Sequence, residues 1–305
     1  MGMREEGLVI RVLGAAYDVQ GPDGVVRCVL RGRLRHRADG PQRPVIGDRV
    51  AFERVSPREG AIVEILPRRT ALVRREPLDP EKAHVIAANL DQIVAVFAVV
   101  PEPDRFQIDR YLAVAEANGL SAILCLNKID LVEDLSSFQE SFKEYEALGY
   151  PVLFTSAVTG AGLDALRERL QGKITAFIGP SGVGKSSLLN ALQPGLALKV
   201  GAINPRTGAG RHTTTRSELI PFDGGYLADT PGLRDIGVWG IRPEDLAACF
   251  PEMRPYIGRC EFSDCLHLEE PGCAIRRAVA RGKISRRRYE SYQRILIDQQ
   301  AASSA

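Results

Sequence analysis

Gly179-Pro180-Ser181-Gly182-Val183-Gly184-Lys185-Ser186 matches the pattern G-x-x-x-x-G-K-[ST], the Walker A phosphate loop. A short apolar, β-prone run, Ile174–Ile178, precedes the loop, and residues 187–192 after it predict the start of a helix. Strand, glycine loop and helix in this order let consecutive backbone N–H groups converge on phosphate oxygens. The stretch therefore predicts that residues 179–187, including Ser187, surround the phosphates of a nucleotide. A chance glycine-rich loop is the weaker interpretation, since both flanks fit.

Two side chains of this loop carry predicted chemistry. Lys185 can supply a positive charge to the β- and γ-phosphates, and Ser186 can offer a hydroxyl ligand to Mg²⁺. Gly182 and Gly184 can adopt backbone conformations closed to other residues, which lets the phosphates approach. We expect the bound nucleotide to carry Mg²⁺.

A second motif predicts which base is bound. Asn127-Lys128-Ile129-Asp130 matches N-K-x-D and directly follows a buried-strand pattern at residues 122–126. The Asp130 carboxylate can accept from guanine N1–H and the 2-amino group, two donors that adenine does not offer there. Asn127 can address the N7/O6 edge, and the stem of Lys128 can cover the ring. Discrimination by unpaired polar groups can reach about 10⁴-fold, so the motif predicts GTP and GDP as ligands.

Two further motifs belong to the same kind of site. Ser156-Ala157 follows the strand-like residues 152–154, and its backbone is expected to meet guanine O6. Asp229-Thr230-Pro231-Gly232 matches D-x-x-G, in which Asp229 can reach Mg²⁺ through water and the Gly232 amide can sense the γ-phosphate. Four elements of one site are hard to collect by accident, although each is weak alone.

The order of these motifs is unusual. In an ordinary GTPase the phosphate loop comes first, and the threonine switch, D-x-x-G, N-K-x-D and S-A follow. Here N-K-x-D and S-A precede the phosphate loop, which predicts a circularly permuted domain. The segment after D-x-x-G therefore leads straight into the C-terminal region, which can respond to the nucleotide.

The segment between the phosphate loop and D-x-x-G resembles a switch. Residues 199–216 are rich in Gly, Thr and Arg, and they contain Arg211-His212-Thr213-Thr214-Thr215-Arg216. A threonine here would ligate Mg²⁺ when the γ-phosphate is present; Thr214 is favoured, but the three adjacent threonines cannot be separated from sequence. Signalling GTPases place a water-orienting Gln directly after D-x-x-G, whereas this chain has Leu233. We therefore expect slow intrinsic hydrolysis, with His212 as candidate water ligand or, equally, as a loop histidine without that role.

The N-terminal region predicts a different domain. Residues 1–75 contain about five short β-prone runs separated by Gly, Pro and Asp, which suits an OB-type barrel. They carry 15 Arg and no Lys against 9 Asp and Glu, a net charge of +6. A strand would place four alternating arginines on one face: Arg31, Arg33, Arg35 and Arg37. Contact with RNA phosphates is favoured over a solvated edge strand that blocks aggregation.

Strand and helix patterns alternate over residues 76–240, which predicts a parallel α/β sheet. Helices are expected at residues 109–117, 135–148 and 163–170, the second with an aromatic core stripe. Residues 241–305 contain Cys260-x₄-Cys265-x-His267-x₅-Cys273, a full Cys₃His set for one structural zinc ion, with unligated thiols as the weaker alternative. A helix follows with Arg286, Arg287 and Arg288 at its start, and a stripe of Tyr289, Tyr292 and Leu296 is expected to dock it; a solvated face is the alternative. The remaining cysteines, Cys28, Cys125 and Cys249, fit buried thiols.

Composition limits the remaining possibilities. A chain of 305 residues suggests two or three domains, and its net charge of +2 implies no polyanion partner by itself. The first residues turn acidic at once, unlike a signal peptide, and the longest apolar run, residues 93–100, is too short to span a bilayer. We expect a cytoplasmic monomer with no membrane contact.

Together these motifs resemble the ribosome small subunit-dependent GTPase A family, which are bacterial circularly permuted GTPases. The resemblance covers nearly the whole chain, and it includes the N-K-x-D motif ahead of the phosphate loop, residues 211–215, D-x-x-G and the cysteine cluster. It implies an N-terminal OB-fold, a C-terminal zinc domain, and GTP hydrolysis stimulated by the 30S subunit. It also implies 16S rRNA binding and a late role in 30S maturation. From the residues themselves, Lys185, His212 and Thr214 are the candidate catalytic residues.

Two other classes of protein stay open from the residues alone. A P-loop kinase of small substrates is disfavoured by the N-K-x-D and S-A pair. A scaffold that only holds nucleotide is kept open by Leu233, which can neither donate nor accept a hydrogen bond.

Overall fold

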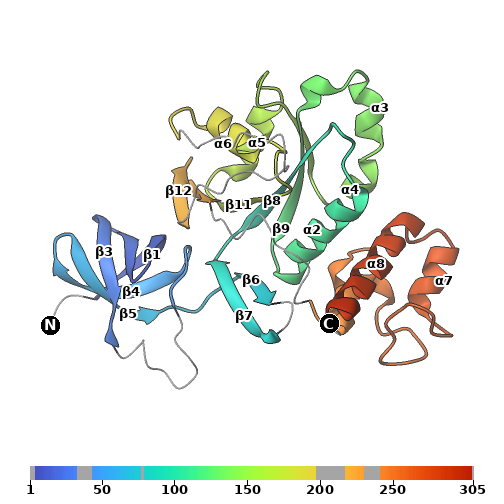
Figure 1. Ribbon diagram of the computed structural model, residues 1–305, viewed down its shortest axis with the longest axis horizontal. Helices are drawn as coiled ribbons and strands as arrows, with labels where there is room; N and C mark the ends of the chain where they lie inside the picture. Colours follow the sequence, from blue (N-terminus) through green and yellow to red (C-terminus); the bar gives the residue numbers. More distant parts are fainter. Residues whose placement is uncertain (1–3, 33–42, 77–78, 197–216, 230–240, 304–305) are drawn as a thin grey trace.

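The computed structural model describes residues 4–32, 43–76, 79–196, 217–229 and 241–303. Figure 1 shows a small β-barrel at one end, a central α/β domain, and a C-terminal helical domain that contacts the central one. The predicted three-part architecture is confirmed. The part of the chain described here contains no helix long and apolar enough to cross a lipid bilayer.

Five strands form the N-terminal barrel: β1 (Arg4–Leu13), β2 (Ala16–Gly21), β3 (Gly24–Leu30), β4 (Arg49–Ser56) and β5 (Glu59–Ile65). They pair in the order β1-β2-β3-β5-β4, and β4 pairs again with β1, so the barrel closes. Only β3 and β5 run parallel among these pairs. Inward side chains such as Val9, Phe52 and Ile62 are fully buried. The closed five-stranded barrel confirms the predicted OB-type fold.

The predicted arginine strand lies mostly outside the described residues. Strand β3 ends at Leu30, and Arg31 pairs with Glu53 through a 2.9 Å contact between NH1 and Oε2. Arg33, Arg35 and Arg37 fall in residues 33–42, which the structure does not describe.

A hairpin joins the barrel to the central domain. It consists of β6 (Ala71–Glu76) and β7 (Asp79–Ala88), which pair antiparallel. The division that we propose between residues 75 and 76 therefore falls inside this hairpin.

Six strands build the central sheet: β8 (Gln92–Ala98), β9 (Ser121–Asn127), β10 (Val152–Thr155), β11 (Ile174–Ile178), β12 (Glu218–Phe222) and β13 (Gly225–Asp229). Their order is β10-β9-β8-β11-β13-β12, and all pairs are parallel except β12 with β13. Strand β11, which leads into the phosphate loop, lies between β8 and β13. The carboxyl ends of the central parallel strands therefore meet at one edge, where ligands of open α/β sheets bind.

Helices cover both faces of this sheet. On one face lie α2 (Arg105–Ala117), α3 (Leu135–Glu140) and α4 (Lys143–Ala147); on the other lie α5 (Leu163–Leu170) and α6 (Lys185–Leu192). Side chains along β8 alternate between the two faces of the sheet. Ile93 and Phe97 pack into the core on one face, and Val94 and Val96 pack into the core on the other. Three residues, 171–173, connect α5 to β11.

The predicted helix at residues 135–148 is two short helices. Helix α3 ends before Ser141, whose hydroxyl donates to the Phe138 carbonyl, and α4 begins after Phe142. The aromatic stripe is nevertheless core, since Phe142 and Tyr145 are fully buried. The break lets the Phe142 ring contact Phe138 and Phe154 at centroid distances of 5.0 and 6.3 Å.

The C-terminal domain consists of η3 (Pro243–Cys249), η4 (Arg254–Tyr256), α7 (Ala274–Ala280) and α8 (Arg286–Ser303). Its apolar residues, including Phe250, Tyr292 and Leu296, belong to the same buried cluster as Ile108 and Leu112 of α2. The domain therefore shares a hydrophobic core with the central domain. The tyrosine and leucine stripe of α8 is buried, as predicted.

A buried charge network crosses this interface. Asp109 of α2 is fully buried and accepts hydrogen bonds from Arg288 NH1 at 2.7 Å, Arg287 NH1 at 2.8 Å and Tyr145 Oη at 2.8 Å. Arg288 is 1% exposed and also donates from Nε to Glu252 at 2.7 Å. Burial alone would lower the pKa of Arg288, but Asp109 and Glu252 outweigh it and raise the pKa. Two of the three arginines at the start of the basic helix are therefore interface residues, which the sequence pattern did not predict.

We expect Asp109→Ala to lower the free energy of unfolding by about 3–5 kcal/mol, because it removes one of the two carboxylate partners of the buried Arg288. Calorimetry with hydrogen exchange on α8 would measure the loss. Arg286→Ala is the matched control, since its pair with Glu290 is exposed at 87% and 58% and is worth about 0.5 kcal/mol or less. Equal losses in both variants would contradict the assigned role of the network.

Candidate nucleotide site and metal centre

The phosphate loop connects β11 to α6 at the carboxyl edge of the sheet. Gly184 precedes the helix with φ of 97°, and a Cβ there would lie 2.4 Å from Asn127 Nδ2. Gly179 has φ of 139°, and a Cβ there would lie 2.1 Å from the Val96 carbonyl oxygen. Both positions therefore require glycine, because the loop is pressed against the ends of β8 and β9.

The Lys185 side chain folds back over the loop that precedes it. Its Nζ donates to the carbonyl oxygens of Gly179 at 2.7 Å and Pro180 at 2.6 Å. The carbonyl groups therefore fix the ammonium at the centre of the loop. Ser186 and Ser187 follow in the first turn of α6 and are half-buried.

The predicted base-recognition motif bonds directly to the phosphate loop. Asn127 is 1% exposed, and its Nδ2 donates to the Val183 carbonyl at 2.9 Å. Lys128 Nζ donates to the Gly182 carbonyl at 2.8 Å. Residues that lie more than fifty positions apart in the chain therefore form one connected site.

A buried hydroxyl group orients the Asn127 amide. Thr155, which is fully buried, donates from Oγ1 to Asn127 Oδ1 at 3.2 Å. The amide oxygen faces this donor, so the amide nitrogen must face the Val183 carbonyl. This role of Thr155 was not predicted from the sequence, where its place directly before Ser156 was the available signal.

Asp130 lies at the exposed rim of the site. Its Oδ1 accepts from the Ser156 hydroxyl at 2.5 Å, and the same hydroxyl oxygen accepts from the Thr159 amide at 3.1 Å. The N-K-x-D and S-A loops are therefore held against each other. The Ser156 side chain thus holds the loop that carries Asp130, in addition to the backbone role predicted for Ser156-Ala157.

Several predicted residues lie outside the described chain. These are His212, Thr214, Gly232 and Leu233. The backbone of Asp229 is described, as the last residue of β13, where it is the register partner of Glu218 in β12. Strand β13 pairs parallel with β11, so Asp229 ends at the same edge as the phosphate loop.

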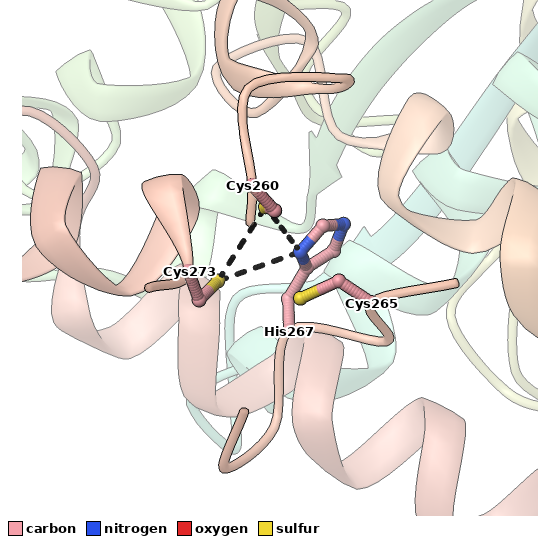
Figure 2. A group of neighbouring side chains, drawn as sticks. All are labelled: Cys260, Cys265, His267 and Cys273. Atoms are coloured by element: carbon pink, nitrogen blue, oxygen red, sulfur yellow. Dashed lines mark hydrogen bonds between the residues drawn. The ribbon is translucent and has the colours of Figure 1, made fainter. Parts of the chain in front are cut away.

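The four predicted metal ligands of the C-terminal domain come together. Figure 2 shows the side chains of Cys260, Cys265, His267 and Cys273 directed toward one another. Their ligand atoms all lie within 4.8 Å of one another. His267 Nδ1 lies 3.5 Å from both Cys260 Sγ and Cys273 Sγ, and these two sulfur atoms are 3.9 Å apart. Tetrahedral zinc bonds imply roughly 3.6 Å between N and S and roughly 3.8 Å between two S atoms, so the set fits zinc.

Burial shifts the pKa values of three cluster residues toward the neutral form of each side chain. Burial lowers the pKa of His267, which keeps the imidazole neutral and able to bind metal, although Glu270 acts in the opposite direction. Burial also raises the pKa of the Cys265 and Cys273 thiols. A bound dication would reverse the thiol shifts, since a metal-coordinated thiol is deprotonated.

Side chains that surround the four predicted ligands fix the backbone of residues 266–268, the metal-ligand loop. The Glu270 carboxylate accepts from the amides of Leu266 at 2.7 Å and Leu268 at 2.8 Å. From α8, Tyr289 Oη donates to the His267 carbonyl and Tyr292 Oη to the Leu266 carbonyl, both at 2.6 Å. His267 itself has φ of 62°. The aromatic stripe was predicted only to dock the helix. Its two tyrosine hydroxyl groups also hold the metal-ligand loop through the carbonyl groups of that loop.

Comparison with known proteins agrees with this geometry. The RsgA GTPase family model matches residues 65–239, and the RsgA N-terminal domain model matches residues 6–62. The small ribosomal subunit biogenesis GTPase RsgA of Gemmatimonas aurantiaca is 46% identical over 294 residues, which is 95% of either chain. The Moorella thermoacetica protein of the same name is 42% identical over 298 residues, 96% of this chain and 97% of its own.

Two solved structures share the whole fold. YjeQ from Thermotoga maritima superposes with a TM-score of 0.79 at 35% identity, covering 98% of this chain and 99% of its own. YloQ, described as a circularly permuted GTPase, has a TM-score of 0.74 at 32% identity, covering 98% of this chain and 96% of its own. The circular permutation predicted from motif order is thereby confirmed. Since these matches extend over nearly the full length, we conclude that the chain belongs to the RsgA GTPase family.

Proposed function

We propose that the protein hydrolyses GTP, binds the 30S ribosomal subunit, and couples hydrolysis to late maturation of that subunit. The observation that carries the nucleotide part is the bond from Asn127 to the Val183 carbonyl, which joins a guanine motif to a phosphate loop. The names of the relatives, small ribosomal subunit biogenesis GTPases, support the partner.

Base recognition depends on two side chains. Asp130 is held by Ser156 through one oxygen and presents its carboxylate at the exposed rim, where it accepts from guanine N1–H and the 2-amino group. Asn127 uses one amide hydrogen on Val183, and its second amide hydrogen addresses guanine N7. Lys128, fixed on the Gly182 carbonyl, covers the ring with its alkyl stem.

The phosphates lie over the start of α6. Backbone amides of the loop and Lys185 bind the β- and γ-phosphates, and Lys185 is already fixed by its two carbonyl partners. Bound Mg²⁺ neutralises charge that develops on the phosphates. Ser186 and Thr214 would hold it, with Asp229 acting through water; the Gly232 amide senses the γ-phosphate.

Hydrolysis on its own is slow in this proposal, because Leu233 occupies the position of the usual water-orienting Gln. His212 positions the attacking water once the small subunit is bound. This part rests on sequence, since both residues lie outside the described chain.

One zinc ion bound by Cys260, Cys265, His267 and Cys273 stabilises the C-terminal domain. The donor set and its spacing support a closed structural site, since all four positions are protein ligands. Zinc supplies fold stability to the long ligand loop, which has no regular structure between η4 and α7.

Both outer domains offer surfaces for 16S rRNA. The N-terminal region has a net charge of +6 over residues 1–75. In the C-terminal domain, five basic residues are exposed around the turn from α7 to α8: Arg276, Arg277, Arg281, Lys283 and Arg286. Arginine and lysine bind phosphate without sequence preference. The protein acts in the cytoplasm as a monomer.

We expect GTP turnover to rise at least about 10²-fold on addition of 30S subunits, equivalent to about 2.7 kcal/mol of the barrier. His212→Ala should lose most of this stimulation while GTP binding is retained. Lys185→Ala is the inactive control, with turnover reduced by about 10²-fold or more. A single-turnover phosphate-release assay with and without subunits measures all three, and full stimulation of His212→Ala would remove histidine from the mechanism.

We expect Asp130→Asn to weaken GTP affinity by roughly 10²-fold or more and to gain affinity for xanthosine triphosphate, because an amide donor replaces an acceptor. Titration calorimetry with GTP, XTP and ATP gives the selectivity and also tests the kinase alternative. Asp134→Asn is the matched control, since Asp134 caps α3 by accepting from the Ser137 amide. Unchanged selectivity in Asp130→Asn would refute the base assignment.

We expect one zinc ion per chain, and its removal by a chelator should unfold the C-terminal domain. Cys265→Ser should lose zinc and melt at a lower temperature, whereas Cys249→Ala, buried but outside the cluster, should keep one zinc per chain. Elemental analysis with thermal melting checks both. Purified protein without zinc but with a folded α8 would contradict the site.

A further inference from the structure

Strand β1 of the barrel pairs with strand β12 of the central sheet. Arg11 of β1 is the register partner of Glu218 at the start of β12, and the Val12 amide donates to the Ser217 carbonyl at 3.2 Å. Arg11 Nε also donates to Glu218 Oε2 at 2.8 Å. Figure 1 shows β12 on the side of the central domain that faces the barrel. The barrel therefore extends the sheet that carries the nucleotide site.

The contacted strand lies next to the D-x-x-G strand. Glu218 is also the register partner of Asp229 across β12 and β13. Adjacent strands are about 4.8 Å apart, so β1 lies only about 10 Å from the backbone position of Asp229. Only β12 lies between β1 and the strand that ends at Asp229, so a displacement of β1 that moves β12 would also move the backbone at Asp229.

A chain of alternating charges leads from this junction to the barrel surface. Arg11 NH1 lies 3.6 Å from Asp18 Oδ2, and Arg27 Nε donates to Asp18 Oδ1 at 2.5 Å. Asp18 is 5% exposed, so its carboxylate depends on these two guanidinium groups. The Arg27 side chain is 55% exposed and lies on β3 between the exposed Val25 and Val29.

We propose that the charge relay Arg27–Asp18–Arg11–Glu218 couples phosphodiester binding on the outer face of the barrel to the nucleotide state. A phosphate that pairs with Arg27 competes with Asp18 for that guanidinium. Asp18 then pairs more strongly with Arg11, which draws Arg11 away from Glu218 and loosens the junction between β1 and β12. By linkage, the nucleotide state changes the affinity of the barrel for RNA by the same factor.

The inference deepens the proposed function and rests on it. The competing interpretation is that the ion pair only packs the barrel against the sheet. Both side chains of the Arg11–Glu218 pair are partly exposed, at 44% and 30%, so neutral variants should remain folded. The two interpretations therefore differ in coupling and not in basal folding.

The test is a double-mutant cycle on nucleotide-dependent binding to 30S subunits. Dissociation constants are measured with GDP and with a non-hydrolysable GTP analogue for wild type, Arg11→Gln, Glu218→Gln and the double variant. For the wild type, the dissociation constants measured with GDP and with the GTP analogue are expected to differ by a ratio (the state ratio) within the usual allosteric range of about 5–150-fold. Each single variant should bring the ratio close to one, and the double variant should add nothing further.

Two additional variants make the result specific. Arg4→Gln is the matched control, because Arg4 lies on the same strand but pairs with Glu64 of β5 on the exposed surface of the barrel, so its ratio should match wild type. Arg27→Gln, at the exposed end of the relay, should lose the state ratio together with part of the subunit affinity. Since the Arg27 side chain is 55% exposed and Asp18 keeps Arg11 as a partner, this variant keeps the test decisive if Arg11→Gln fails to fold.

The failures are distinguishable. If the wild-type protein binds 30S subunits with the same affinity in the presence of GDP and of the GTP analogue, the ribosome-coupled function itself is contradicted. A wild-type ratio that persists in Arg11→Gln, Glu218→Gln and Arg27→Gln overturns the relay and leaves the function standing.

Discussion

The nucleotide site depends on one buried amide. Asn127, at the end of β9, bonds to the Val183 carbonyl of the phosphate loop and is oriented by the Thr155 hydroxyl at the end of β10. Three strands of the sheet are thereby connected at their carboxyl ends. An unpaired amide at 1% exposure would cost the free energy of a lost hydrogen bond. Guanine recognition and phosphate binding therefore cannot be assembled separately, and the circular permutation leaves this arrangement in space unchanged.

The C-terminal domain packs against the face of the central domain that contains α2. Its core is continuous with α2, and Asp109 joins two arginines of α8 to that helix. Helix α8 also places two tyrosine hydroxyl groups on the carbonyls of the metal-ligand loop. The metal centre is thus connected to the central domain through one helix. A partner that binds the cysteine-rich loop would therefore contact a domain that is packed against α2, and not a separate domain on a flexible linker.

Local patterns made much of this architecture predictable. The phosphate loop, N-K-x-D and the Cys₃His set are defined by residue type and spacing, and the barrel strands by alternation between turn residues. The broken helix at Ser141 was missed because tertiary packing of Phe142 outweighs helical periodicity. Arg287 and Arg288 resembled solvated charge because the sequence does not show that Asp109, nearly 180 positions away, is buried against them. Thr155 and Glu270 were missed for the same reason, since their importance lies in what they contact.

The permuted chain, in which three residues join α5 to β11, also sets the order in which the parts of the domain are made. During synthesis the guanine half, with β8, β9 and β10, leaves the ribosome before β11 and its phosphate loop. These three strands are neighbours in the finished sheet and can pair at once. The backbone groups along one edge of β8 stay unpaired until β11 has been synthesised, and an unpaired apolar edge promotes aggregation. The nascent chain therefore carries an incomplete nucleotide site and an open sheet edge until β11 pairs with β8 and the phosphate loop completes the site.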